Sequence, residues 1–131
     1  MKKFIEKIAA LEQTISTVKG DFVLFALFLR EDAQDKWDLV VSAPWIEVNK
    51  KAALSYLANE LKSHLRVQEM LTLSRIVLVN NDDPALGAIH KAINVEHGMF
   101  EIKDSNFFGL QIKHAYIITS KRHAVTSSSG K

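Results

Sequence analysis

Two acidic residues and a lysine in the first half of the sequence are spaced as a metal-dependent site could be. Asp38 lies in the largely apolar segment 37–43, and Glu47 and Lys50 follow within a few residues. Carboxylates are the ligands that Mg²⁺ prefers, and a lysine can stabilise the charge that develops on a phosphate during its transfer. Asp38, Glu47 and Lys50, with Glu6 as a further acid, are therefore candidate catalytic residues of a Mg²⁺-dependent phosphodiesterase.

An early helix followed by a hairpin that carries acids resembles the PD-(D/E)xK nucleases over residues 1–80. In that family a Glu or Asp and a Lys, separated by one residue, lie on a strand. Here Glu47-Val48-Asn49-Lys50 has one residue more and lies beyond Pro44. The resemblance implies a nuclease-like activity with Mg²⁺. In the alternative, Asp38 is a charge at a strand edge, and Glu47 and Lys50 belong to the start of a helix.

A polar segment, Asn80-Asn81-Asp82-Asp83, separates the predicted strand 74–79 from Pro84. In open sheets with parallel strands, ligand crevices form at the carboxyl ends of the strands. Asp82 and Asp83 are therefore a candidate loop for a ligand or an ion. The alternative is that Asp83 caps a helix that begins at Pro84, because an acceptor before a proline is typical of helix starts.

The other chemistry-bearing residues form no recognisable motif. The sequence has no cysteine, no GxSxG and no glycine-rich phosphate loop, and its five histidines form no HExxH pair. His64 is expected to be a packed or boundary residue. The carboxyl end is basic, and we interpret it as a solubilising tail. The alternative is that it contacts phosphate groups, which would make nucleic acid a partner. The basic residues there are Lys113, His114, Lys121, Arg122 and His123.

The overall composition is that of an ordinary globular protein. The 131 residues are 47% hydrophobic and 24% charged, with a formal net charge of +2, so basic residues do not dominate as in many nucleic-acid-binding domains. The longest apolar run, Phe22–Leu29, is much shorter than a membrane span. We expect a cytoplasmic protein that has no membrane partner.

Hydrophobic periodicity predicts a mixed α/β (α+β) fold in the order α-β-β-α-β-α-(β)-β, with helices packed on a sheet of four to five strands. The run Phe22–Leu29 is apolar on both faces, which predicts a central strand between two layers. We expect one domain over residues 1–120 and a disordered tail over 121–131. The predicted helices are 2–18, 50–65 and 84–94, and the predicted strands are 22–29, 37–43, 74–79, 99–103 and 110–119.

Two adjacent aromatic residues, Phe107 and Phe108, follow a predicted turn at Asp104–Asn106. Neighbouring side chains of an extended segment point to opposite sides, so one ring is expected to face outward and contact a second copy in a homodimer. The alternative is a bend at Gly109 that turns both rings inward. The sequence thus favours a non-catalytic interaction or regulatory module that self-associates and needs no cofactor. The alternative is the Mg²⁺-dependent phosphodiesterase.

Overall fold

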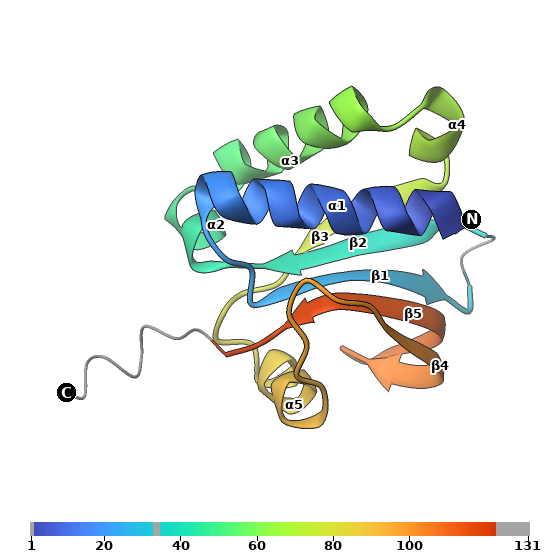
Figure 1. Cartoon of the computed structure of the whole chain (residues 1–131). Helices are drawn as coiled ribbons and strands as arrows, with labels where there is room; N and C mark the ends of the chain where they lie inside the picture. The colour runs from blue at the N-terminus through green and yellow to red at the C-terminus, as the bar shows by residue number, and fades with distance from the viewer. Residues whose placement is uncertain (1, 33–34, 123–131) are drawn as a thin grey trace.

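The computed structural model describes residues 2–32 and 35–122, which form five helices and five strands. In chain order they are α1 (Lys2–Lys19), β1 (Leu24–Arg30), β2 (Trp37–Ser42), α2 (Pro44–Val48), α3 (Lys50–His64), α4 (Val67–Met70), β3 (Leu73–Leu78), α5 (Pro84–Ala92), β4 (Phe100–Phe107) and β5 (Leu110–Ser120). The strands form one mixed sheet, with helices packed around it (Figure 1). This is the predicted α+β class.

The strand that the sequence places at the centre is the middle strand of the sheet. The spatial order is β3-β2-β1-β5-β4. β1 is antiparallel to both β2 and β5, which confirms the predicted hairpin. β2 and β3 are parallel, as two strands joined through helices can be.

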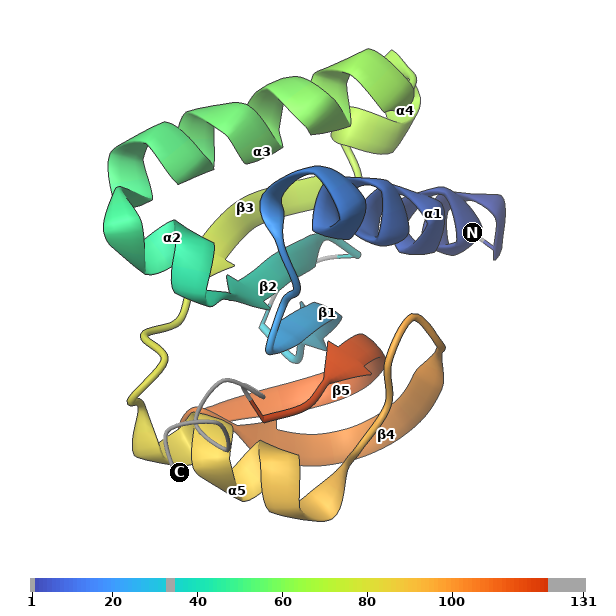
Figure 2. The same ribbon diagram turned by 60° about the vertical axis from the view of Figure 1, so that its left-hand side comes forward.

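Each face of the sheet has its own apolar cluster, and β1 contributes to both. Helices α1 and α3 cover one face, and α5 lies on the other (Figure 2). Phe25 packs on the α1 side and Phe28 on the α5 side, and the two are 1% and 2% exposed, which confirms the two-layer prediction. An alternation that started at Phe22 would place Phe22 on the side of Phe28 and Val23 on the side of Phe25. The structure differs because the regular strand begins only at Leu24: Phe22 packs with Phe25, and Val23 lies on the α5 side.

Two helices begin where the sequence predicts. The Asn49 side chain accepts a hydrogen bond from the backbone N of Ala52 at 3.1 Å and caps α3. The Asp83 side chain accepts one from the backbone N of Ala85 at 2.9 Å and caps α5, with Pro84 as the first helical residue. Both caps satisfy amides that have no partner inside the helix.

The turn predicted at Asp104–Asn106 is wrong. β4 runs through these residues to Phe107, with Asp104 at φ +50°, and aspartate tolerates such a conformation better than most residues. The chain turns instead at Phe108 and Gly109, at φ +56° and +74°. Two successive residues with positive φ match the tight turn that the twist of a hairpin favours. β4 is therefore longer than the predicted strand 99–103.

Three surface residues also differ from expectation. Val18 lies three residues after Ile15 in the predicted helix 2–18, a spacing that would bury it, but it is 67% exposed, while Ile5 is buried. His64 is exposed, and its ring lies 2.8 Å from the carbonyl of Glu60. Lys121 belongs to the fold, because its backbone N donates to the carbonyl of Val23 at 3.1 Å.

Residues 123–131, which make up the rest of the predicted disordered tail and include His123, lie outside the described part of the chain. In the part that is described, no helix has both the length and the apolar character needed to cross a membrane.

Candidate functional site

The structure separates Asp38 from the other two residues of the candidate phosphodiesterase site. Glu47 Oε1 and Lys50 Nζ lie 3.8 Å apart, beyond the carboxyl end of β2. Asp38 is near the start of that strand, and at about 3.3 Å per residue some 13 Å of strand separate it from Ser42. Within residues 2–32 and 35–122, no three His, Asp or Glu side chains are placed to hold a metal ion. The three predicted residues thus do not assemble into one Mg²⁺ site.

Asp38 is a buried ion-pair residue, so the interpretation of it as a strand-edge charge is wrong. It is 2% exposed, because β2 lies between β1 and β3. Arg30 Nε donates to Asp38 Oδ2 at 2.9 Å, and Arg75 Nε lies 3.2 Å from the same oxygen. This bond with Asp38 raises the pKa of Arg30. The other oxygen, Oδ1, is buried and has no hydrogen-bond partner among the described residues.

A cavity of about 230 Å³ lies beside Asp38 on the α5 side of the sheet, and we call it the Asp38 cavity. It reaches from the start of α5 to the β4–β5 turn. Its apolar lining comes from both sheet and turn. Its polar lining includes two acids, one of which, Asp38, already contacts the arginine of the lining, Arg75. The lining residues are Phe28, Asp38, Val40, Arg75, Val77, Leu78, Val79, Asn80, Asp83, Phe108 and Leu110.

The predicted ligand or ion loop connects β3 to α5. The carboxylate of Asp83 caps α5, and Asp82 is exposed. Ser42 Oγ donates to Asn81 Oδ1 at 2.7 Å, and the Asn81 backbone N donates to Glu47 Oε2 at 3.1 Å. The alternative prediction, that Asp83 caps a helix, is thus confirmed. The two hydrogen bonds of Asn81 hold the loop against the carboxyl end of β2.

A larger cavity, of about 400 Å³, lies beside α5, and we call it the α5 cavity. Its lining contains two permanent cations and an amide, and no carboxylate from the described residues. The lining residues are Val23, Asn81, Leu86, Gly87, His90, Lys91 and Arg122.

The side chains of the α5 cavity are positioned by the fold around it. His90 Nε2 lies 2.8 Å from the Val23 carbonyl, which can only accept, so Nε2 carries the hydrogen. Because Asn81 Oδ1 accepts from Ser42, its amide NH₂ remains as the donor. Lys91 forms no ion pair with any described residue.

The basic residues of the carboxyl end do not form one patch. His114 Nε2 contacts Glu101 Oε2 at 2.6 Å on β4, and Lys113 is exposed on β5. Lys121 pairs with two acids, Asp21 and Glu96. Arg122 lines the α5 cavity.

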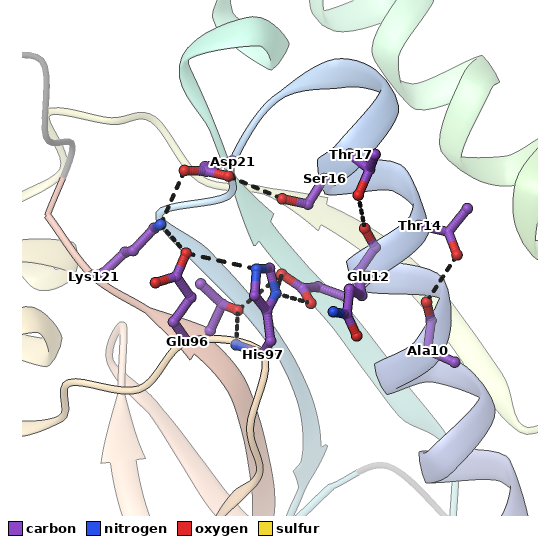
Figure 3. Close-up of polar contacts among 11 residues, drawn as sticks. Ala10, Glu12, Thr14, Ser16, Thr17, Asp21, Glu96, His97 and Lys121 are labelled. Carbon is purple, nitrogen blue, oxygen red and sulfur yellow. Dashed lines mark hydrogen bonds and ion pairs between the residues drawn. The ribbon is translucent and has the colours of Figure 1, made fainter.

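A buried carboxylate that contacts a partly exposed histidine is a feature that the sequence did not predict. Glu12 of α1 is fully buried, and His97 Nδ1 lies 2.8 and 3.1 Å from its two carboxylate oxygens (Figure 3). Thr119 Oγ1 donates to Glu12 at 2.9 Å and accepts from the backbone N of His97 at 3.1 Å. The one signal in the sequence is that Glu12 lies four residues after Ile8, on the buried side of α1.

Charged residues extend this pair to the surface. His97 Nε2 lies 3.6 Å from Glu96, and Glu96 and Asp21 both contact Lys121 Nζ (Figure 3). The hydrogen bond from Lys121 lowers the pKa of Asp21. Burial by itself would lower the pKa of Lys121, but its bonds with Glu96 and Asp21 outweigh burial and raise it.

A carboxylate that holds Nδ1 of a histidine is the arrangement of many general bases. Here, however, Nε2 of His97 faces Glu96, and His97 lines neither the α5 cavity nor the Asp38 cavity. The pair joins α1 to β5 and to the segment between α5 and β4. We therefore assign it to holding that segment in place.

The two predicted interface residues lie on the same side of the sheet. The Phe107 ring stacks on Phe28 with centroids 5.1 Å apart, and Phe108 lies 6.3 Å from Phe28. Both rings are half-buried. The turn at Phe108 and Gly109 thus produces the inward alternative, and neither ring offers the outward contact on which the dimer hypothesis depended.

Comparison with protein-family models, curated proteins and solved structures finds no match for this chain. The geometry of the two cavities is therefore the basis on which a function can be inferred.

Proposed function

We propose that the protein is a non-catalytic binding module that takes a small anionic ligand in the α5 cavity. The observation that carries this proposal is the chemistry of the lining. Lys91 and Arg122 are permanent cations, and Asn81 offers an amide donor, while none of the lining residues is acidic. Charge-assisted hydrogen bonds of this kind bind carboxylate and phosphate groups, so a ligand that carries either group suits the cavity.

The lining also argues for binding rather than catalysis. It contains no serine, threonine, cysteine, aspartate or glutamate from the described residues, so it offers no hydroxyl or thiol nucleophile and no carboxylate base. The apolar members Val23 and Leu86 can contact the body of a ligand whose anionic group meets the cations. A few polar groups in a mostly apolar hollow are typical of small-molecule sites.

Gly87 provides a test of this site that does not depend on weakening the fold. A Cβ built at Gly87 meets no described atom within 4 Å, so a larger side chain there extends into open space. Because glycine inside a helix is unfavourable by about 1 kcal/mol relative to alanine, Gly87→Leu should stabilise α5 while it fills the cavity.

The experiment titrates the full chain with benzoate, phenyl phosphate and the neutral isostere benzamide, and follows ¹⁵N–¹H NMR shifts of residues 87–91. We expect one of the two anions to bind there at least tenfold more tightly than benzamide. Lys91→Met and Arg122→Met should each weaken binding about tenfold, and Gly87→Leu should abolish it while raising the melting temperature.

Lys113→Met is the matched control, because Lys113 is an exposed lysine of β5 that does not line the cavity. It should leave anion binding unchanged. Equal binding of benzamide and both anions, or undiminished anion binding by the folded Gly87→Leu variant, would contradict the proposal. The relative strength of benzoate and phenyl phosphate then separates a carboxylate ligand from a phosphate ligand.

A further inference from the structure

The Asp38 cavity has features that neither the anion site nor the packing of the sheet explains. Asp38 Oδ2 has both arginine contacts, while Oδ1 is buried without a hydrogen-bond partner among the described residues. Buried carboxylate oxygens are nearly always hydrogen-bonded, because leaving one unpaired is costly. Asp38 itself lines the cavity, so a ligand there lies next to an acceptor that lacks a donor.

Arg75 is the more exposed of the two arginines that contact Asp38. Its side chain is 50% exposed on the edge strand β3, whereas that of Arg30 is 18% exposed. Oδ1 is sealed from solvent as the side chains lie, so a donor reaches it only when a neighbour shifts. When the Arg75 side chain moves away from Asp38, its guanidinium still borders the cavity. There it can donate to an acceptor on the ligand whose donor reaches Oδ1.

The rest of the lining favours a flat ring. Phe28 and Phe108 bring two aromatic rings to the cavity, with centroids 6.3 Å apart, and Val40 and Val77 add aliphatic surface from the sheet. At about 230 Å³ the cavity is smaller than the usual sites of drug-sized ligands, which start at about 300 Å³. One or two fused rings suit this volume better than an extended chain.

We propose that the Asp38 cavity is a second binding site, for a flat aromatic ring with an amide-like edge. The N–H of that edge donates to Asp38 Oδ1, and its neighbouring oxygen accepts from Arg75. Such edges occur on nucleobases and on aromatic carboxamides, and this shared chemistry is what the site recognises. A carboxylate in the same position brings a second negative charge to Asp38, so this site prefers the neutral molecules that the α5 cavity disfavours.

A matched pair of probes tests this site on the full chain. Benzamide and acetophenone have nearly the same shape, but acetophenone has a methyl group in place of the NH₂ donor. In ¹⁵N–¹H NMR titrations we expect benzamide to shift the resonances of Asp38, Arg75 and Phe108, and to bind at least tenfold more tightly than acetophenone. Guanosine and nicotinamide then compare a nucleobase edge with a carboxamide edge.

Three variants complete the test. Asp38→Asn should weaken benzamide binding about tenfold, and Arg75→Gln should weaken it severalfold, whereas Lys62→Gln, an exposed position of α3, should leave it unchanged. Equal affinity for acetophenone and benzamide, or benzamide shifts confined to residues 87–91, would overturn the proposal. If Asp38→Asn does not fold, Arg75→Gln decides, because unchanged benzamide binding by that variant also overturns it. Anion binding in the α5 cavity is a separate measurement, so either proposal can fail alone.

Discussion

Replacing Asp38 by Asn should destabilise the protein by about 2–3 kcal/mol, most of it through Arg30. The substitution keeps the size of the side chain but removes the charge that two arginines share. Breaking a buried ion pair costs about 3–5 kcal/mol when one charge stays buried and unpaired. We expect Asp38→Asn to cost less than this general value because asparagine still offers an acceptor and both arginines can reach water.

The two arginines should differ in their energetic coupling to Asp38. Arg30 Nε lies 2.9 Å from Oδ2 and its side chain is 18% exposed, so we expect a coupling of about 1.5–2.5 kcal/mol, as for a hydrogen bond to a charged group. Arg75 Nε lies 3.2 Å away, and its side chain is 50% exposed. Solvent screens such a pair, so its coupling should be about 0.5 kcal/mol.

Double-mutant cycles measure both couplings. Asp38→Asn is combined with Arg30→Met and with Arg75→Met, and unfolding in urea is followed by the fluorescence of Trp37, which neighbours Asp38 on β2 and is 3% exposed. Lys62→Met is the control for loss of an exposed charge. A loss below about 0.5 kcal/mol for Asp38→Asn, or a stronger coupling to Arg75 than to Arg30, would refute the reasoning.

The remaining predictions concern the core and the polar network. Phe25→Ala should cost about 3–5 kcal/mol in urea unfolding, because the ring is 1% exposed in the α1-side cluster. Glu12→Gln should cost about 2–4 kcal/mol and speed amide exchange at His97, because it removes the charge of a fully buried carboxylate that contacts His97. Lys121→Met should remove a stability increment that is constant near neutral pH. The pKa of Asp21 is lowered from its ordinary value of 3.8, so the increment is lost as pH falls below that value. The pKa of Lys121 is raised from its ordinary value of 10.5, so the increment is also lost as pH rises above that value. Urea titrations across pH check both limits.

The fold class was predictable because local patterns and global packing agree. The uninterrupted apolar run of β1 requires cover on both faces, and the caps Asn49 and Asp83 mark helix starts that depend on neighbouring residues alone. The end of β4 was not predictable in the same way. Asp104 is typical of a turn, but its neighbours Lys103 and Ser105 pair with β5 and keep it in the strand, and such tertiary pairing overrides a local preference.

The candidate sites were far less predictable, because they join residues that are distant in the chain. Glu12 and His97 are 85 positions apart and belong to no spacing motif, so only the fold brings them together. Asp38 was singled out from the sequence as a residue that could carry chemistry, but its predicted partners lay close in sequence rather than in space. Its actual partners, Arg30 and Arg75, come from the strands on either side of β2.

The loop from Asn80 to Asp83, predicted from the sequence to hold a ligand or an ion, lies next to both cavities. β2 and β3 are parallel, and the carboxyl ends of parallel strands are where open sheets form ligand crevices. Both cavities meet this loop, since Asn81 lines the α5 cavity and Asn80 and Asp83 line the Asp38 cavity. Because the carboxylate of Asp83 caps α5, the loop shapes both sites through its backbone and its asparagines. The charges that would select ligands come instead from α5 and Arg122 on one side and from β2 and β3 on the other.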